Sequence, residues 1–229
     1  MYEIQLFGRL EVRTRGVRLS GEDLGGAEPR QILALLALHG ALRKDELAEL
    51  LWAGRPPAAV EDTMEGHLSL LRRRLDPEAA DTDSVITTAG GGYSLVADRV
   101  RVDVARFDEL VAAASGRTAS RALRPLTAAA HVAARPLLED VEQPRWATIA
   151  RERYRLRVVT ALLDAAGHAC AIGDPRTALT LAEQALDLDP TCARGKTIME
   201  RARHALGDDS AELRETHHAT PPAHSETIT

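Results

Sequence analysis

Three consecutive arginines, Arg72, Arg73 and Arg74, close a segment whose spacing is typical of a helix. A guanidinium group binds phosphate oxygens through its fixed charge and its fork of N–H donors. Small and polar side chains that could approach base edges occupy the preceding turns, at Thr63, Gly66, His67 and Ser69. Phosphate contacts position a protein on DNA, and base contacts supply sequence specificity. These residues therefore predict a DNA-reading helix, although the arginines also suit the C-terminal end of a helix dipole.

An apolar stripe fixes which side of this segment faces the protein core. The stripe recurs at intervals of three and four residues, at Val60, Met64, Leu68, Leu71 and Leu75. The opposite face is expected to hold Asp62, Gly66, Ser69, Leu70 and Arg73. Asp76-Pro77 should end the helix. Gly66 destabilises a helix by about 1 kcal/mol relative to alanine. Its presence is explained either by a close approach of the helix backbone to DNA or by a neutral substitution that the fold tolerates.

A β-hairpin is predicted directly after this helix. Its strands should cover residues 85–88 and 93–96, and Gly90-Gly91-Gly92 permits the positive φ angles of a tight turn. Candidate DNA contacts on the hairpin are Thr87, Thr88, Gly92 and Tyr93. The Tyr93 ring either packs under the hairpin or brings its hydroxyl to a phosphate. Arg55, in the Pro-rich loop before the helix, is a further candidate contact.

The segments before the DNA-reading helix are predicted to form a small sheet and two helices. Residues 2–19 alternate apolar and polar side chains, which predicts a small sheet. A helix from Arg30 to His39 is apolar on nearly all sides and should be central, with Pro29 in its first turn. A second helix, Lys44 to Trp52, should bury its leucines, with Trp52 filling the core. We therefore predict an N-terminal winged helix-turn-helix with a small β-sheet and a wing hairpin over residues 1–100.

The second half is predicted to be all α-helical over residues 101–207. Asp103 is a good N-cap for a helix from Val104 to Ala114, and later breaks are expected at Pro125, Arg135-Pro136, Pro144, Gly173-Asp174 and Asp189-Pro190. Residues 159–192 fit one tetratricopeptide repeat, with Ala166, Ala178 and Ala185 where two helices cross closely. Residues 208–229 are polar and aperiodic, so they are expected to form a disordered tail. The predicted fold class is mainly α, a winged helix followed by a tetratricopeptide-like domain.

Composition and the absence of certain motifs limit which classes of function this sequence can have. The formal net charge is −5, and residues 1–100 carry 12 basic and 16 acidic residues, so any basic DNA-binding surface must be local. Cys170 and Cys192 are too few and too isolated for a zinc site or a disulfide framework. No phosphate loop, nucleophile elbow or paired metal ligands occur, so we expect no enzyme, no cofactor and no metal. No apolar run is long enough to span a bilayer, and we expect a cytoplasmic protein.

The two halves together resemble the Streptomyces antibiotic regulatory protein family, over about residues 2–207. In the first half the resemblance rests on Leu6-Phe7-Gly8, Arg30, Leu50-Leu51-Trp52, Leu71–Leu75, Ile86-Thr87-Thr88 and Gly92–Leu95. In the second half it rests on Val102-Asp103 with Phe107, Pro136-Leu137-Leu138 with Asp140, Trp146 with Arg151, and Ala178–Leu186 with Asp189-Pro190.

The resemblance implies a transcriptional activator, in which an OmpR-like winged helix precedes a bacterial transcriptional activation domain. Family members bind direct repeats near promoters of antibiotic gene clusters and contact RNA polymerase and its sigma factor. In that arrangement the Val60–Leu75 helix enters the major groove and the hairpin reaches the adjacent minor groove. The implied partners are double-stranded DNA and the polymerase. A homo-oligomer is expected at least on DNA, with the protein located at the nucleoid.

A second interpretation is a protein-interaction regulator whose winged helix binds DNA weakly or not at all. Three acidic residues, Glu61, Asp62 and Glu65, crowd the start of the DNA-reading helix. They would repel phosphates unless they accept hydrogen bonds from cytosine amino groups. Leu70 stands where family members usually carry a basic residue, and the hairpin tip has no lysine or arginine. The arginine cluster and the hairpin favour DNA binding, whereas the charge of the first half favours the alternative.

Overall fold

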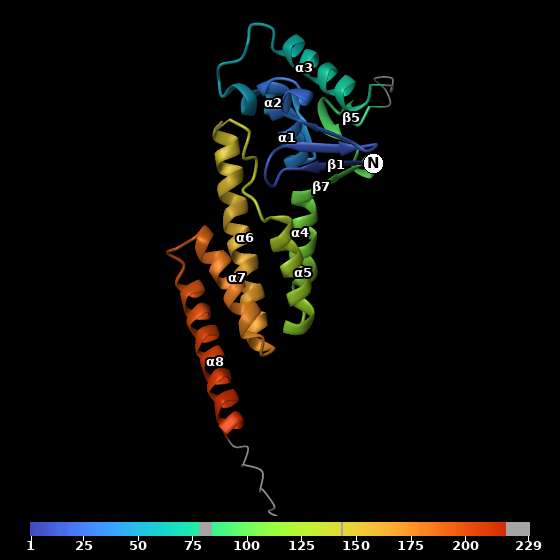
Figure 1. Ribbon diagram of the computed structural model, residues 1–229. Coiled ribbons are helices and arrows are strands. Elements are labelled where there is room, and N and C mark those ends of the chain that lie inside the picture. The colour runs from blue at the N-terminus through green and yellow to red at the C-terminus, as the bar shows by residue number, and fades with distance from the viewer. Residues whose placement is uncertain (78–83, 143, 219–229) are drawn as a thin grey trace, which may run out of the picture. The chain divides into compact units, whose positions relative to one another are not determined.

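The computed structural model describes residues 1–77, 84–142 and 144–218 (Figure 1). The chain divides into two compact units. The first unit comprises Met1–Ser115 and Ala128–Val158, and the second comprises Gly116–Thr127 and Val159–Thr229. Two helices, α5 (Ala119–Val132) and α6 (Arg145–Ala171), contribute residues to both units.

A four-stranded sheet opens the first unit. Its strands are β1 (Tyr2–Gln5), β2 (Glu11–Thr14), β3 (Val17–Ser20) and β7 (Val100–Val102), in the order β3-β2-β1-β7. The first three strands pair antiparallel, and β7 pairs parallel to β1 with Tyr2 opposite Val100. The predicted burial of Ile4, Leu6, Leu10 and Val12 is confirmed, whereas Val17 in β3 is exposed and Leu19 is half-buried. A short 3-10 helix, η1 (Gly21–Leu24), leads from the sheet into the helices.

Three helices follow in the predicted order. They are α1 (Ala27–His39), α2 (Lys44–Trp52) and α3 (Val60–Leu75). Helix α1 is the central helix, because Ile32, Leu33, Leu35 and Leu36 are completely buried. Pro29 lies in its first turn, as expected. Trp52 is half-buried rather than a core plug, because it lies in the last turn of α2 beside the exposed residues Ala53 and Gly54.

The hairpin after α3 belongs to a second, three-stranded sheet. Strands β5 (Ile86–Ala89) and β6 (Gly92–Leu95) pair antiparallel, and β4 (Ala41–Arg43) pairs with the other edge of β6. Strand β4 was not predicted, because its three residues carry no alternation of their own. The sheet ties the segment between α1 and α2 to the wing. The predicted wing hairpin is confirmed within one residue at each strand.

Residues beyond the winged helix continue the first unit. Helix α4 (Asp103–Ala114) begins one residue earlier than predicted, and Val102 rather than Asp103 occupies the N-cap position. The Asp103 carboxylate instead accepts hydrogen bonds from the backbone N–H groups of Leu6 and Phe7, at 2.8 to 2.9 Å. Those two donors follow the end of β1, so the aspartate fastens α4 to the sheet. Burial is the main influence on this carboxyl and raises the pKa of Asp103, although the backbone N–H bonds oppose the rise.

The segment from Pro136 to Val141 also fastens to the sheet. Gly8 donates its N–H to Pro136 O at 2.7 Å, and Leu138 donates its N–H to Leu6 O at 2.7 Å. The Asp140 carboxylate accepts from Leu10 N–H, while Arg151 donates to three carbonyls of this segment, those of Leu137, Leu138 and Val141. Rings of Phe7, Phe107 and Tyr154 meet edge to face, with centroids 5.7 to 6.2 Å apart. Several residues that carry the family resemblance therefore hold this unit together.

The expected boundary at residue 100 does not coincide with the division into compact units. Residues 101–115 and 128–158 group with the winged helix, because of the contacts made by Asp103, Asp140 and Arg151. Independent folding of residues 1–100 stays a prediction. None of the helices in the described ranges combines the length and the hydropathy needed to cross a membrane.

The second unit is entirely helical among its described residues. It contains the first turns of α5, the second half of α6, α7 (Pro175–Leu188) and α8 (Ala193–His218). Asp174 caps α7 by accepting from Thr177 N–H at 3.0 Å, so the predicted break at Gly173-Asp174 is confirmed. Three predicted crossing residues, Ala166, Ala178 and Ala185, have no exposed surface. Gly195 of α8 lies so close to α7 that an added Cβ would come within 3.0 Å of Leu186.

Two predictions for the helical half are wrong. Pro125 lies inside α5 instead of ending it, because the helix buries Ala122, Leu126 and Ala129 along one face. Helix α8 runs on to His218, into the segment expected to be a disordered tail. Residues 211–215, Ala-Glu-Leu-Arg-Glu, are good helix formers and no glycine or proline interrupts the helix beyond Gly207. The remainder of the expected tail, residues 219–229, lies outside the described residues.

Replacing Ala178 by leucine is expected to destabilise the second unit by about 1–3 kcal/mol, because the added methylenes overpack a completely buried crossing. Urea denaturation followed by circular dichroism measures the loss. The matched control is Ala193→Leu, at an exposed position of α8. Equal stability of the two variants would show that the α7 crossing has room for a larger side chain.

Candidate nucleic-acid interface

Helix α3 lies along the outer edge of the winged helix, with the β5–β6 hairpin at its C-terminal end (Figure 1). Its inner face is the predicted stripe, in which Met64, Leu68, Leu71 and Leu75 are buried and Val60 is half-buried. The outer side of α3 carries the exposed residues Glu61, Asp62, Gly66, Arg73 and Arg74. Thr63, His67 and Ser69 are half-buried along its flanks. The predicted base-reading residues therefore reach the surface on one helix.

Arg72 has a different role from its two neighbours. Its side chain is only 11% exposed. The guanidinium donates from Nε to Ile86 O at 3.1 Å and from Nη2 to the Thr88 hydroxyl at 2.9 Å. Both acceptors lie on β5, so Arg72 braces the wing against α3. Only Arg73 and Arg74 of the predicted cluster project freely enough to meet phosphates.

The hydroxyl group of Tyr93, beneath the wing, explains why α3 carries the acidic residue Glu65. The Tyr93 hydroxyl donates to Glu65 Oε1 at 2.7 Å, and the Tyr93 ring is buried. Lys44 Nζ lies 3.5 Å from the same carboxylate and 5.6 Å from the Tyr93 ring centroid. Burial, the hydrogen bond to Glu65 and the Glu65 charge together raise the pKa of Tyr93. Glu65 is thus a structural acceptor, and Tyr93 packs under the wing rather than reaching a phosphate.

Gly92 is required by the packing of two backbones. A Cβ at this position would lie 2.3 Å from Leu42 O and 3.0 Å from Arg43 Cα, both on β4. The exposed turn of the wing is Gly90-Gly91, where both glycines have positive φ angles and open space around them. Gly92 therefore shapes the wing from beneath, and the turn before it is the part free to approach another molecule.

The remaining predicted contacts lie on the surface or support it. Thr88 is exposed and accepts from Arg72, while Thr87 is half-buried with its hydroxyl 3.0 Å from the Ser94 hydroxyl. Arg55 is exposed in the loop between α2 and α3, where its backbone N–H donates to Trp52 O. Gly66 has open space where a Cβ would stand. The structure thus brings Thr63, Gly66, His67, Arg73 and Arg74 together on α3, and separates Gly92 and Tyr93 from them as buried wing residues.

Leu70 departs from its expected outward position. It is half-buried, and its Cδ2 lies 2.9 Å from the point where a Cβ on Gly25 would stand. The turn after η1 covers this flank of α3, so Leu70 packs against the protein. A basic residue in its place would have to leave that contact before it could reach a phosphate.

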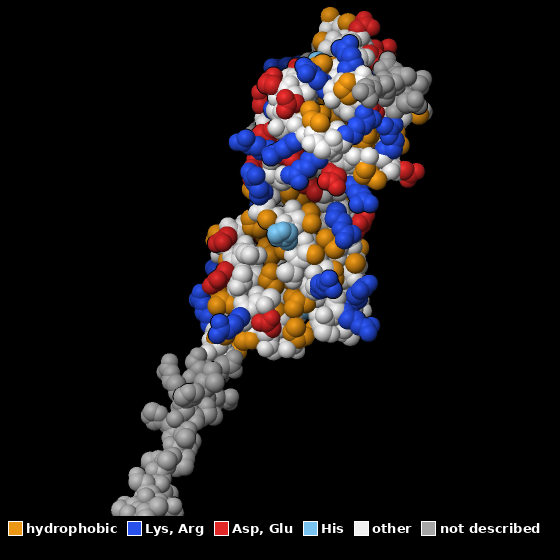
Figure 2. All heavy atoms as spheres, turned by 45° about the vertical axis from the view of Figure 1, so that its right-hand side comes forward, with side chains coloured by type: hydrophobic (Ala, Val, Ile, Leu, Met, Phe, Trp, Pro, Cys, Tyr) orange, Lys and Arg blue, Asp and Glu red, His pale blue; other side chains and the backbone are white. Residues whose placement is uncertain are grey.

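Charges of both signs share the surface around α3. On the face shown in Figure 2, lysine and arginine side chains alternate with acidic ones over the winged helix instead of forming one continuous basic patch. Glu61 and Asp62 lie exposed in the first turn of α3, where carboxylates suit the helix dipole. Neither makes an ion pair with another residue in the part of the chain that the structure describes. The basic surface is local to Arg73 and Arg74, with Arg55 at the preceding loop.

Sequence reasoning missed the contact between Lys44 and Glu65. The two residues are far apart in the chain, and each is unremarkable in its own helix. The available signal was Tyr93, because a buried tyrosine hydroxyl normally needs a hydrogen-bond partner.

Together, the four-stranded sheet, the three helices and the wing define a winged helix-turn-helix protein, and an all-α-helical part follows in the chain. The predicted fold class, mainly α with a small N-terminal β component, is confirmed.

Comparisons with known proteins support the same class. A scan against protein-family models finds no match. The chain is 28% identical over 169 residues to the transcriptional regulator RedD of Streptomyces coelicolor, a match that covers 71% of this chain and 47% of RedD. The fold is similar to that of Mycobacterium tuberculosis EmbR, solved in complex with a low-affinity phosphopeptide, with a TM-score of 0.76 and 24% identity.

That structural match covers 93% of this chain and 57% of EmbR. The chain therefore spans about half the length of the relatives it matches. Similarity to RedD supports the predicted resemblance to the Streptomyces antibiotic regulatory protein family, and similarity to EmbR shows the fold alone.

Proposed function

We propose that this protein is a sequence-specific DNA-binding transcriptional activator. The observation that carries the proposal is the pair of exposed arginines, Arg73 and Arg74, at the end of an exposed helix that Arg72 braces to the wing. A helix and a hairpin held in fixed register can occupy neighbouring grooves of one duplex. Similarity to the transcriptional regulator RedD supports a role in transcription.

In the proposed complex α3 enters the major groove. Thr63, His67 and Ser69 approach base edges, and Gly66 lets the helix backbone come close to the duplex. Arg73 and Arg74 pair phosphates at one end of the helix, and Arg55 pairs a phosphate near its start. The Gly90-Gly91 turn of the wing reaches the adjacent minor groove. Thr87 and Thr88 support that turn, and Gly92 and Tyr93 shape it from beneath.

The finer features of the proposal come from the family resemblance. We propose binding to direct repeats near promoters of a secondary-metabolite gene cluster, by a homo-oligomer assembled at least on DNA. Contacts to RNA polymerase and its sigma factor would then activate transcription at the nucleoid. The tetratricopeptide-like helices would pair protomers or modulate the activity of the activator, because such repeats stack into binding surfaces. Binding alone accounts for this activity, without a cofactor.

Fluorescence anisotropy with the DNA upstream of the protein's own gene tests the proposal. A shuffled duplex of equal length and composition is the control. Binding that favours the upstream duplex by ~1,000-fold or more at physiological salt is expected, since specific sites exceed non-specific DNA by at least this factor. Equal binding to both duplexes, or none, would favour the alternative of a protein-interaction regulator with a degenerate winged helix.

That alternative is supported by the acidic surface. The winged half carries 12 basic and 16 acidic residues, and Glu61 and Asp62 stand exposed at the start of α3. Glu65 no longer counts against DNA binding, because Tyr93, Lys44 and Arg72 engage its carboxylate. The electrostatic repulsion between α3 and DNA phosphates therefore comes mainly from Glu61 and Asp62.

Neutralising those two residues should tighten DNA binding. In the double variant Glu61→Gln, Asp62→Asn, affinity is expected to rise most at low salt, where exposed charges act over the longest distance. Anisotropy titrations between roughly 0.05 and 0.2 M salt measure the effect. Glu183→Gln with Glu200→Gln removes two negative charges from exposed positions of α7 and α8 as a control. Unchanged affinity in the first variant would place the start of α3 away from the duplex.

A further inference from the structure

The N-terminal half of helix α6 carries exposed apolar side chains on one face. Ile149 and Leu156 are 58% and 49% exposed. Seven residues separate them, so they lie on the same side of the helix, and Arg153 falls between them on that side. These three residues are called the α6 stripe below. Apolar side chains that gather on a surface beside polar ones are typical of sites that bind another protein.

The surroundings of the α6 stripe are basic. Arg153 and Arg145, which lies one turn before Ile149, are both exposed, and neither makes an ion pair within the ranges that the structure describes. The acidic residue on this side, Glu152, accepts two hydrogen bonds from Arg155, each 2.8 Å long. The stripe therefore presents two apolar groups and a net positive charge.

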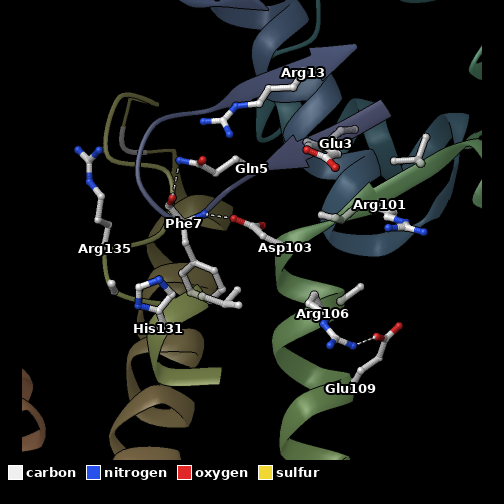
Figure 3. Close-up of a pocket in the computed structure, with 16 residues that line it drawn as sticks. Glu3, Gln5, Phe7, Arg13, Arg101, Asp103, Arg106, Glu109, His131 and Arg135 are labelled. Atoms are coloured by element: carbon white, nitrogen blue, oxygen red, sulfur yellow. Dashed lines mark hydrogen bonds and ion pairs between the residues drawn. The ribbon is translucent and has the colours of Figure 1, made fainter. Parts of the chain in front are cut away.

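Other surfaces of the first unit do not include the α6 stripe. The proposed DNA-binding surface lies on α3 and the wing. Figure 3 shows a cavity beside β1, β7 and α4, and none of its described lining residues belongs to α6. The stripe is therefore available to a partner while DNA is bound.

Helix α8 is longer than the helix it packs against. Helix α7 spans 14 residues and α8 spans 26, so at 1.5 Å per residue α8 is about 18 Å longer. Figure 1 shows α8 running on past α7. Beside α7, the buried residues Gly195, Ile198 and Ala202 of α8 recur at spacings of three and four. Residues 206–218, called the α8 end below, extend beyond this packed part.

The amino-acid sequence continues the same spacing into the α8 end. Leu206, Asp209 and Leu213 follow Ala202 at intervals of four, three and four residues. Residues 208–218 also have a net charge of −3 with histidine neutral, from one arginine, Arg214, and four acidic residues, Asp208, Asp209, Glu212 and Glu215. A helix end with this pattern suits a partner that is both apolar and basic.

The α8 end and the α6 stripe have matching patterns. Leu206, Asp209 and Leu213 are spaced by three and four residues, and Ile149, Arg153 and Leu156 by four and three. These intervals coincide when two helices lie antiparallel. We propose that the α8 end of one copy of this protein docks antiparallel on the α6 stripe of a second copy. In that contact Leu213 meets Ile149, Asp209 meets Arg153, and Leu206 meets Leu156.

The contact forms between copies because the two surfaces lie at opposite ends within one chain. Short loops, residues 172–174 and 189–192, join α6 to α7 and α7 to α8, and successive helices joined in this way run antiparallel. Helices α6 and α8 therefore run in the same direction, and the α8 end points away from the start of α6. Ile149 lies about 33 Å from the C-terminal end of α6, at 1.5 Å per residue.

A contact between two different surfaces arranges copies head to tail rather than about a two-fold axis. Head-to-tail copies match direct repeats in DNA, and in this respect the inference rests on the proposed function. Two copies held on neighbouring repeats are at an effective concentration of about 1 mM, so a weak contact between them is sufficient.

Sedimentation equilibrium of the full chain without DNA tests the contact. Association that increases with protein concentration, up to about 1 mM, is expected. The stripe variant Ile149→Asp, Leu156→Asp and the end variant Leu213→Asp should each weaken association by roughly tenfold or more. A mixture of the two variants should form a 1:1 complex, because each supplies the surface that the other lacks. Ile172→Asp, at an exposed apolar position outside the stripe, is the control and should associate like the wild type.

A charge exchange tests the pairing of Arg153 with Asp209 independently of the apolar residues. Arg153→Asp and Asp209→Arg should each weaken association, and the double variant should recover it, because opposite charges then face each other again. A wild-type chain that stays monomeric at about 1 mM would overturn the proposal. Undiminished association of the stripe variant, no complex in the mixture, or no recovery in the double variant would also overturn it. Because these experiments contain no DNA, such results leave the proposed DNA binding intact.

Discussion

Replacing Arg73 and Arg74 by alanine is expected to weaken binding to every DNA sequence by roughly 100-fold, taking about 1.5 kcal/mol for each charged hydrogen bond to phosphate. Both side chains are exposed on α3, and neither belongs to the internal network that holds the wing. Because phosphate contacts carry no sequence information, specific and non-specific affinity should fall together.

The salt dependence gives an independent measure of the same two contacts. The slope of log affinity against log salt should flatten by about 0.9 for each lost contact, or about 1.8 for the pair. Anisotropy titrations across a salt series measure both quantities. The control Arg121→Ala, Arg201→Ala removes equal charge from exposed positions outside the winged helix. A loss confined to one operator sequence, or an equal loss in the control, would contradict the phosphate role.

Gly92→Ala is expected to destabilise the wing by about 3 kcal/mol, at the upper end of the cost of overpacking. The added methyl group would stand 2.3 Å from Leu42 O, and neither backbone can move without opening the β4–β6 pairing. Tyr93, the next residue along β6, would then lose its position above Glu65. Thermal unfolding, together with loss of DNA affinity, measures the effect.

The matched control is Gly91→Ala at the wing turn. An alanine there has open space but must adopt a φ angle of +77°, which costs roughly 1–2 kcal/mol. Gly92→Ala should therefore cost clearly more than Gly91→Ala. If the two variants unfold at the same temperature, the β4–β6 contact is looser than the structure indicates.

Local patterns predicted most of the secondary structure. The apolar spacing from Val60 to Leu75 identified α3, and the glycine run identified the wing turn, because both signals arise from residues close in sequence. Strand β4 was missed because three residues paired with a distant strand carry no periodic signal. Asp103 looked like a helix cap, since the sequence does not show that Leu6 and Phe7 bring N–H donors to it.

The sequence predicted which segments form the candidate DNA-binding surface, but it did not predict the role of each residue in them. The Arg72–Arg74 run marked the correct end of α3, yet only the fold shows that Arg72 turns to β5 while Arg73 and Arg74 face outward. Glu65 looked like an obstacle to DNA binding because its partners Tyr93 and Lys44 lie in other elements. Roles that depend on contacts between distant segments need the three-dimensional structure.

Hydroxyl-radical footprinting of the full chain on the DNA upstream of its own gene tests the central claim most directly. We expect protection of repeated short segments of the sugar–phosphate backbone on one face of the duplex, in direct-repeat orientation, including the minor groove that the wing enters. The Arg73→Ala, Arg74→Ala variant should lose the entire pattern at the same protein concentration, whereas Arg121→Ala, Arg201→Ala should keep it. Uniform cleavage with the wild-type protein, at concentrations that saturate any binding to DNA, would contradict sequence-specific recognition by this winged helix.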